Sequence, residues 1–195
     1  MSDRNVRRKV AWGITGSGDK IRETFNTMKG LREEHGDVEV EVFLSKAGEL
    51  VTRFYRLEEE LRETFPKTFV EKSANSPFLA ARLQLGEFDF LLIAPATSNT
   101  VAKLAHGVAD TLLTNSALQA LKTYVPVHIM PVDYREGTTV TKLPDGREMR
   151  LRVRKEDAAN AQRISEMDGV HAFERPEEIE DIFRRYYTDP DSSVD

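Results

Sequence analysis

Two short polar turns are the residues of this chain best suited to hold a ligand. Glycine lets the backbone approach a phosphate closely, and the free N–H groups at a helix start favour a dianion. Four consecutive small polar side chains offer neutral hydrogen-bonding groups for hydroxyls and a heteroaromatic ring. Each turn also has a simpler interpretation as a helix cap, because Ser, Thr and Asn are preferred caps. The two turns are Gly16-Ser17-Gly18 and Thr97-Ser98-Asn99-Thr100.

Both turns follow a predicted buried strand and open a predicted helix. Val10–Ile14 leads into the first turn and a helix over residues 19–35, and Phe88–Ala94 leads into the second. Repeated strand–helix order predicts an α/β fold, a Rossmann-like doubly wound parallel sheet. Because ligands bind outside the carboxyl ends of such strands, we expect the two turns to share one site.

The remaining elements follow from periodicity and turn residues. We expect strands at Val38–Leu44 and Thr68–Val70, and helices at Leu50–Phe65, stopped by Pro66, and at Pro77–Leu85. Beyond residue 135 the pattern predicts a β-hairpin, Thr138–Leu143 and Glu148–Val153, around the turn Pro144-Asp145-Gly146, followed by helices at 156–167 and 176–187.

Composition narrows the class of protein. The 195 residues carry a net charge of −5 and include no cysteine. The negative net charge argues against nucleic acid as the main partner. The absence of cysteine excludes a cysteine nucleophile and an iron–sulfur cluster held by the chain's own thiolates. The four histidines are scattered, so we expect no metal site. No apolar stretch is long enough to span a membrane and the N-terminus is too polar for a secretory signal, so we expect a cytoplasmic protein.

The two turns, with Ser45 and a long central motif, resemble the FMN-binding flavoprotein superfamily. The motif runs from Ala94-Pro95-Ala96-Thr97-Ser98-Asn99-Thr100 through Val101-Ala102-Lys103-Leu104-Ala105-His106-Gly107-Val108-Ala109-Asp110-Thr111-Leu112-Leu113-Thr114. The superfamily includes the cysteine decarboxylases, the flavin prenyltransferases, and the archaeoflavoprotein and dihydromethanopterin reductase branch. The tail of this chain is more similar to that last branch.

The resemblance implies a position for FMN. Gly16, Ser17 and Gly18 would lie at its phosphate, Ser45 would touch it, and Thr97–Thr100 would hold the flavin. From the residues alone, Ser45 is better explained as the cap of a helix that starts at Lys46.

Departures from the family pattern restrict the chemistry. The decarboxylases carry a histidine in the region that here reads Pro77–Leu83, and a Pro-x-Met-Asn segment where this chain has Met130-Pro131-Val132-Asp133-Tyr134. Neither is present, so cysteine decarboxylation is disfavoured. Val132 and Asp133 stand where the prenyltransferases have an Arg-Glu pair, which weighs against that activity as well.

The resemblance therefore implies an FMN-dependent oxidoreductase that passes electrons from a reduced, ferredoxin-like protein to an acceptor such as dihydromethanopterin. The alternatives are a flavin prenyltransferase-like enzyme and a non-catalytic flavin-binding subunit, and no protein acid or base is identified. We expect a homo-oligomer built from trimers, with the flavin near a subunit contact. Residues 1–135 would form the FMN-binding domain, 136–187 a hairpin and helices packed on it, and 188–195 a disordered tail.

The predicted hairpin is rich in basic residues. They are either solvated or a docking site for an acidic partner. The residues expected to face outward are Lys142, Arg147, Arg150, Arg152 and Arg154.

Overall fold

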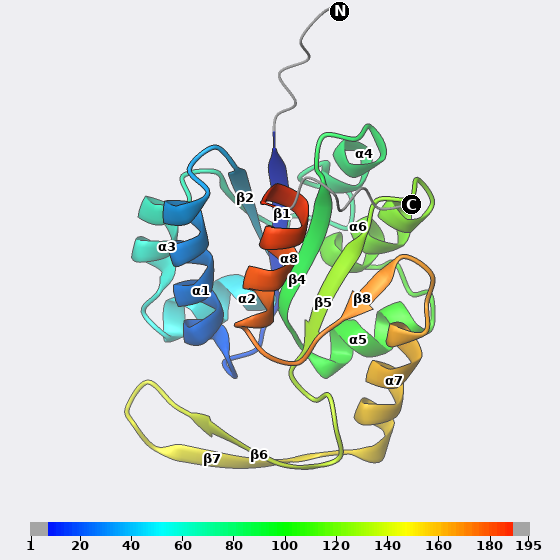
Figure 1. Cartoon of the computed structure of the whole chain (residues 1–195). Coiled ribbons are helices and arrows are strands. Elements are labelled where there is room, and N and C mark those ends of the chain that lie inside the picture. The colour runs from blue at the N-terminus through cyan, green and yellow to red at the C-terminus, as the bar shows by residue number, and fades with distance from the viewer. Residues whose placement is uncertain (1–7, 189–195) are drawn as a thin grey trace, which may run out of the picture.

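Six parallel strands form the central sheet of the computed structural model, which describes residues 8–188 (Figure 1). Their order, β3-β2-β1-β4-β5-β8, confirms the doubly wound Rossmann-like fold. The strand order reverses between β1 and β4, so the carboxyl ends of these two strands border the crevice where such folds bind ligands. The strands are β1 (Lys9–Ile14), β2 (Glu39–Leu44), β3 (Thr68–Val70), β4 (Phe90–Ala96), β5 (Val127–Pro131) and β8 (Val170–Ala172).

Helices cover both faces of the sheet, because side chains of successive strand residues point to opposite faces. On β1, Val10 and Trp12 pack into one buried cluster, while Ala11 packs into the other. One cluster includes residues of α1 (Ile21–Glu34), α3 (Glu58–Thr64) and α8 (Glu178–Tyr187). The other includes residues of α4 (Leu79–Gln84), α5 (Ser98–Ala105), α6 (Leu112–Leu121) and α7 (Lys155–Ser165).

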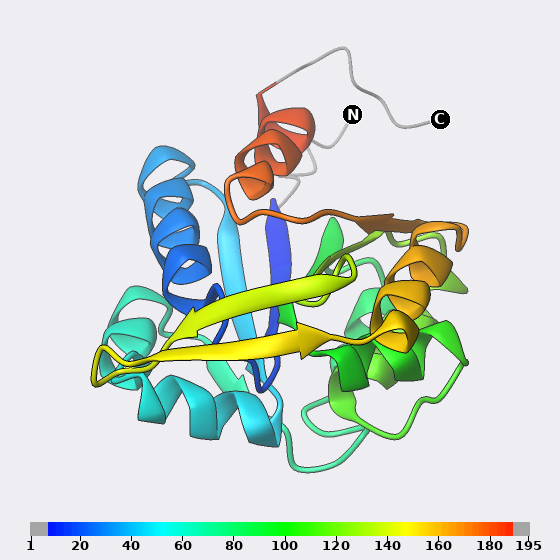
Figure 2. The same cartoon turned by 90° about the horizontal axis from the view of Figure 1, so that it is seen from below.

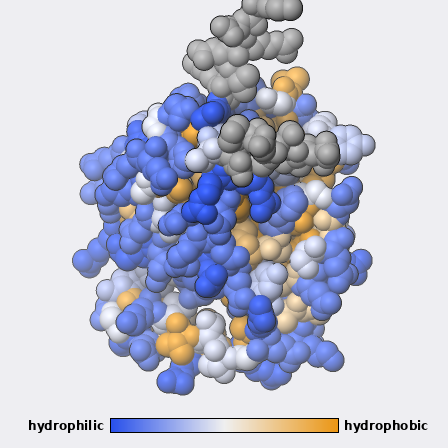
Figure 3. Space-filling view, viewed as in Figure 1, coloured by the Kyte–Doolittle hydropathy of each residue, from blue (hydrophilic) through white to orange (hydrophobic). Residues whose placement is uncertain are grey.

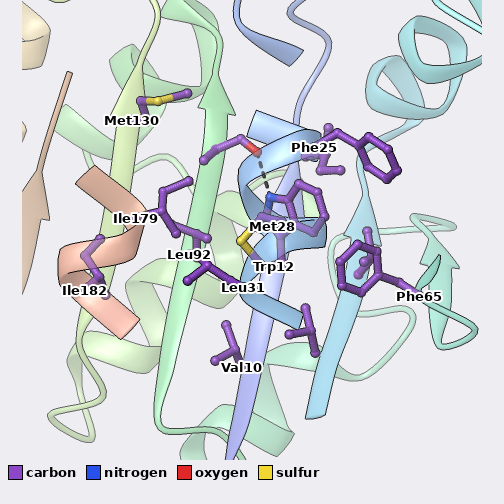
Figure 4. Packing of buried hydrophobic residues seen from close by; sticks show 14 of the residues in the cluster. Val10, Trp12, Phe25, Met28, Leu31, Phe65, Leu92, Met130, Ile179 and Ile182 are labelled. Carbon is purple, nitrogen blue, oxygen red and sulfur yellow. Dashed lines mark hydrogen bonds between the residues drawn. The ribbon is translucent and has the colours of Figure 1, made fainter. Parts of the chain in front are cut away.

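Trp12 anchors β1 in the first cluster. Its ring lies among Phe25, Met28 and Phe65 (Figure 4), and it meets the Phe65 ring edge-on with centroids 5.4 Å apart. Its indole Nε1 donates a hydrogen bond of 2.8 Å to the carbonyl oxygen of Ala94 on β4. This bond satisfies the one polar atom of a fully buried ring and ties together the two strands that border the crevice.

Most element bounds differ from the sequence-based expectation by one or two residues, and two differences lie next to the site. The predicted helix Leu50–Phe65 is two helices, α2 (Lys46–Phe54) and α3, because Arg56 adopts a left-handed φ of 57°. This break turns the chain so that Leu57 is buried at 1% exposure. In addition, β4 continues to Ala96, two residues beyond the expected end.

The predicted hairpin forms a separate two-stranded antiparallel sheet, β6 (Gly137–Lys142) and β7 (Glu148–Val153). It lies across the carboxyl ends of the central strands (Figures 1 and 2). After it, α7 packs against α5, β8 pairs with β5, and α8 packs against α1. Thr188 is the C-cap of α8, and the rest of the expected tail, 189–195, lies outside the described residues.

Between residues 8 and 188, no helix is both long and apolar enough to cross a membrane.

Candidate functional site

Thr15 joins the two polar turns at the carboxyl ends of β1 and β4. Its buried hydroxyl donates to the carbonyl oxygen of Pro95 at 2.8 Å and accepts from the backbone N–H of Thr97 at 2.9 Å. The backbone N–H of Thr15 also donates to Pro95, at 3.3 Å. One side chain thus fixes the position of each turn relative to the other.

The first turn presents unpaired backbone donors. The N–H groups of Gly16, Ser17 and Gly18 donate to no other residue in the described part of the chain, while the hydroxyl of Ser17 accepts from the N–H of Asp19 at 3.2 Å. α1 begins only at Ile21, and its N-cap, Lys20, makes no side-chain cap bond. The interpretation of this turn as a simple helix cap is therefore wrong. Successive free N–H groups form the kind of concavity that binds an anion.

Close packing requires two glycines in this turn. A Cβ on Gly16 would lie 2.5 Å from the Cβ of Ala47, and a Cβ on Gly18 would lie 2.3 Å from the hydroxyl oxygen of Tyr55. Both distances are below normal contact, so a side chain at Gly16 would push the turn away from α2, and one at Gly18 would displace the turn or the Tyr55 ring.

The second turn combines a cap with exposed polar groups. The hydroxyl of Thr97 caps α5 by accepting from the backbone N–H of Thr100, and the two threonine hydroxyls lie 3.1 Å apart. Ser98 donates its hydroxyl to the carboxylate of Asp133, which follows β5. The amide of Asn99 makes no hydrogen bond to another described residue. The cap interpretation thus holds for Thr97, with Thr100 as the residue it caps, while Asn99 retains its hydrogen-bonding capacity.

Both turns line one cavity of about 460 Å³, which is within the usual range for small-molecule sites. Figure 3 shows the molecule hollowed between the hairpin at the bottom and the body above it. The cavity is lined by Gly16–Asp19, by Val51, Phe54 and Tyr55 of the α2 region, by Thr97–Asn99, by Val132 and Asp133, and by the hairpin residues Thr139, Thr141, Leu143, Met149 and Leu151.

Ser45 and Thr100 are not on the wall of this cavity. The hydroxyl of Ser45 accepts from the N–H of Gly48 at 2.9 Å and caps α2. Each of these two residues therefore supports a helix start next to the cavity, and its contact with a cofactor stays a prediction.

The hairpin has two chemically different faces, and only the basic one was expected from the sequence. Cross-strand pairing places Thr139 opposite Leu151 and Thr141 opposite Met149, and these four residues all line the cavity. The sequence contains a signal for this arrangement: charged and uncharged residues alternate strictly along Glu148–Arg152, which indicates a strand with one charged and one uncharged face.

The outer face of the hairpin is less basic than expected. Arg147 pairs with Asp145 at 2.7 Å and Arg154 with Asp157 at 2.6 Å. Lys142, Arg150 and Arg152 lie on the outer face and form no ion pair with any residue from 8 to 188.

Asp19 attaches the hairpin to the first turn. Its Oδ1 accepts from the hydroxyl of Thr141 at 2.9 Å, whereas its Oδ2 is buried and meets no donor within the described residues. Burial raises the pKa of this carboxyl, opposed by the Thr141 hydrogen bond. An unsatisfied buried acceptor beside the cavity suits a ligand that brings hydroxyl donors.

These features fit a phosphorylated heteroaromatic cofactor. The glycine turn supplies backbone donors for a phosphate, Thr97 and Asn99 supply neutral polar groups, and Phe54, Met149 and Leu151 supply partly exposed apolar surface. Fold and site together define a doubly wound α/β protein that binds a nucleotide-like cofactor at the switch point of its sheet.

The chain belongs to the Flavoprotein family, whose model matches residues 1–143. It is 32% identical to a dihydromethanopterin reductase (acceptor) of Methanocaldococcus jannaschii, covering 91% of this chain and 96% of that protein. It is 43% identical to a second protein of that organism, MJ0730, covering 91% of this chain and 95% of the relative.

Among solved structures, Burkholderia xenovorans DmrB in complex with FMN, described as a cubic protein cage for redox transfer, superposes with a TM-score of 0.80. The two sequences are 31% identical, and the match covers 93% of this chain and 96% of DmrB. These relatives confirm the expected superfamily and its dihydromethanopterin reductase branch.

Proposed function

We propose that this protein is an FMN-dependent reductase that passes electrons from a small reduced protein to a pterin acceptor such as dihydromethanopterin. The main support for this function is that one cavity is lined by both turns: the glycine turn with its unpaired backbone amides, and the polar turn after β4. Two relatives that match over most of their length, a dihydromethanopterin reductase and the FMN-containing DmrB, support the same assignment.

Each part of the site has a distinct task. The amides of Gly16, Ser17 and Gly18 bind the phosphate, while Thr97 and Asn99 orient the polar part of the flavin. Bound FMN supplies the electron-transfer chemistry. The hairpin, held by Asp19 and Thr141, covers the opening and limits the access of water.

The proposal includes partners and assembly. A ferredoxin-like donor is favoured over a nicotinamide dinucleotide, because FMN occupies the one glycine turn suited to a phosphate among the described residues.

Phe54, on the cavity wall, is 60% exposed, and Leu50 of the same helix is 62% exposed, which favours a subunit contact there. We propose a homo-oligomer built from trimers, in line with the cage described for DmrB, working in the cytoplasm with its donor.

FMN binding is the first test. The purified protein should release FMN, not FAD, on denaturation. Ser17→Asp should abolish FMN binding because a carboxylate would repel the phosphate, whereas Ser17→Ala, which keeps the backbone amide, should retain it. A wild-type protein that neither contains nor binds FMN would refute the proposal, and full affinity in Ser17→Asp would move the phosphate elsewhere.

Electron transfer is the second test. Under anaerobic stopped-flow conditions, reduced ferredoxin should reduce the bound flavin much faster than NADH or NADPH, and a dihydropterin should reoxidise it. Rapid reduction by NAD(P)H would contradict the proposed donor.

Release of carbon dioxide from a cysteine-ended peptide above a free-FMN control would contradict the exclusion of decarboxylase activity.

A further inference from the structure

A second cavity of about 640 Å³ lies beside the first, at the turn end of the hairpin. It is bordered by the start of α1, the break between α2 and α3, and the end of β6. The two cavities share the lining residues Gly18, Asp19, Tyr55, Thr141 and Leu143, so they are contiguous.

The second cavity differs from the first in charge. Its lining includes four cationic side chains and two carboxylates, Asp19 and Glu23, although the chain as a whole has a net charge of −5. The first cavity has no cationic side chain on its wall. The four cations are Lys20, Arg22, Arg56 and Lys142.

Two of these cations form hydrogen bonds within the described chain, and two are available to bind a ligand. The ammonium of Lys20 donates to the carbonyl oxygen of Glu174 at 2.9 Å, and Arg22 donates to the carbonyl oxygen of Tyr55 at 3.0 Å. Arg56 and Lys142 make no side-chain hydrogen bond or ion pair with any residue between 8 and 188.

Tyr55 places both available cations at the boundary of the two cavities. The residue after it, Arg56, has the left-handed backbone that ends α2, and the Tyr55 hydroxyl donates to the carbonyl oxygen of Lys142 at 3.2 Å. The ring of Tyr55 also packs against Gly18, where a Cβ would meet its hydroxyl. A ligand that extends out of the first cavity past Tyr55 therefore reaches Arg56 and Lys142.

We propose that the second cavity binds a negatively charged group, a phosphate or carboxylate, on the tail of the electron acceptor. This inference rests on the proposed function and specifies its substrate class: a flat ring that enters the flavin cavity and an anionic tail that crosses Tyr55. The phosphate of FMN is the other source of such a charge, but the unpaired amides of Gly16–Gly18 already provide for it.

The test compares two non-reacting pterins as ligands of the FMN-loaded, oxidised protein. Folate carries two tail carboxylates, whereas biopterin has an uncharged side chain. Dissociation constants are measured from the change in flavin fluorescence, at low and high salt. The cation-removing variant is Arg56→Asn/Lys142→Gln, because Asn tolerates the left-handed backbone at position 56. The matched control is Arg150→Gln/Arg152→Gln, which removes the same charge from the outer face of the hairpin.

We expect the wild-type protein to bind folate at least about tenfold more tightly than biopterin at low salt, with a smaller difference at high salt. The Arg56→Asn/Lys142→Gln variant should lose that preference through weaker folate binding alone, and the outer-face control should keep it. Affinity for FMN should be the same in all three proteins.

Three outcomes would overturn the inference. These are equal binding of the two pterins by the wild type, an unchanged preference in Arg56→Asn/Lys142→Gln, and a loss of FMN affinity in that variant, which would assign the cavity to the cofactor phosphate. Failure of the proposed function is separate, because it would appear as absent FMN binding or as a reduced flavin that no dihydropterin reoxidises.

Discussion

Replacing Thr15 with valine should weaken both the fold and the binding of FMN. Valine has nearly the same shape, so the change removes hydrogen bonds without creating a cavity. The Thr15 side chain is buried, and its hydroxyl bonds at 2.8 Å to the carbonyl of Pro95 and at 2.9 Å to the N–H of Thr97. Each bond is worth about 0.5–1.5 kcal/mol net, and an unsatisfied buried group adds to the loss. We therefore expect the free energy of unfolding to fall by about 2 kcal/mol.

Two measurements on Thr15→Val check this reasoning. For a chain of this size, about 2 kcal/mol corresponds to a fall in Tm of about 4–8 °C, measured by calorimetry on the FMN-free protein. The Kd for FMN should rise about tenfold, which equals ~1.4 kcal/mol, because the two turns are no longer held at a fixed separation. Thr15→Ser keeps the hydroxyl and is the matched control. If Thr15→Val and Thr15→Ser have the same Tm and the same Kd for FMN, the bridging role of Thr15 is wrong.

Three further changes test other parts of the structure. Gly18→Ala should lower FMN affinity because the new Cβ would lie 2.3 Å from the Tyr55 hydroxyl, and equilibrium dialysis showing unchanged affinity would contradict that steric reasoning. Arg150→Glu/Arg152→Glu should slow reduction by ferredoxin at low salt and have little effect at high salt; a rate independent of both changes would remove the outer face of the hairpin from donor docking. Burial lowers the pKa of His128 to about 3, below its value of about 6.5 in the unfolded chain. Between these two pH values, His128 binds a proton in the unfolded chain but not in the folded one. The free energy of unfolding therefore falls as pH falls through this range. In urea titrations from pH 7 to 4, His128→Phe should show a shallower loss of stability than wild type, and equal slopes would refute the assignment to His128.

The sequence by itself determined the fold class and the two turns. Alternating strand and helix patterns dictate a parallel sheet, since a strand buried on both faces reads as a continuous apolar run, as in Phe90–Ala94. Polar residues directly after such strands must lie at one edge of the sheet, which is why the sequence alone indicates Gly16–Gly18 and Thr97–Thr100 as site residues; all of these except Thr100 line the cavity. The comparisons confirm the family, the cofactor and the class of reaction that this pattern indicated.

Local sequence did not resolve which polar residues cap helices and which face a ligand. Ser, Thr and Asn suit both roles, and the choice depends on where the helix starts in three dimensions. The structure makes Ser45 and Thr97 caps, and places Thr100 in the first turn of α5, where its N–H donates to Thr97. It leaves the amide of Asn99 without a partner in the described chain and starts α1 four residues after Ser17.

Only the tertiary structure decided what covers the site and what extends it. The hairpin is more than 100 residues from the glycine turn, yet Thr141 bonds to Asp19 at a sequence separation of 122. Likewise, the left-handed backbone of Arg56 breaks a stretch with helical periodicity and places this cation on the cavity that Lys142 also lines. Contacts of this kind depend on how the chain returns across the sheet, and neither periodicity nor local turn preference carries that information, because both describe only residues close together in the sequence.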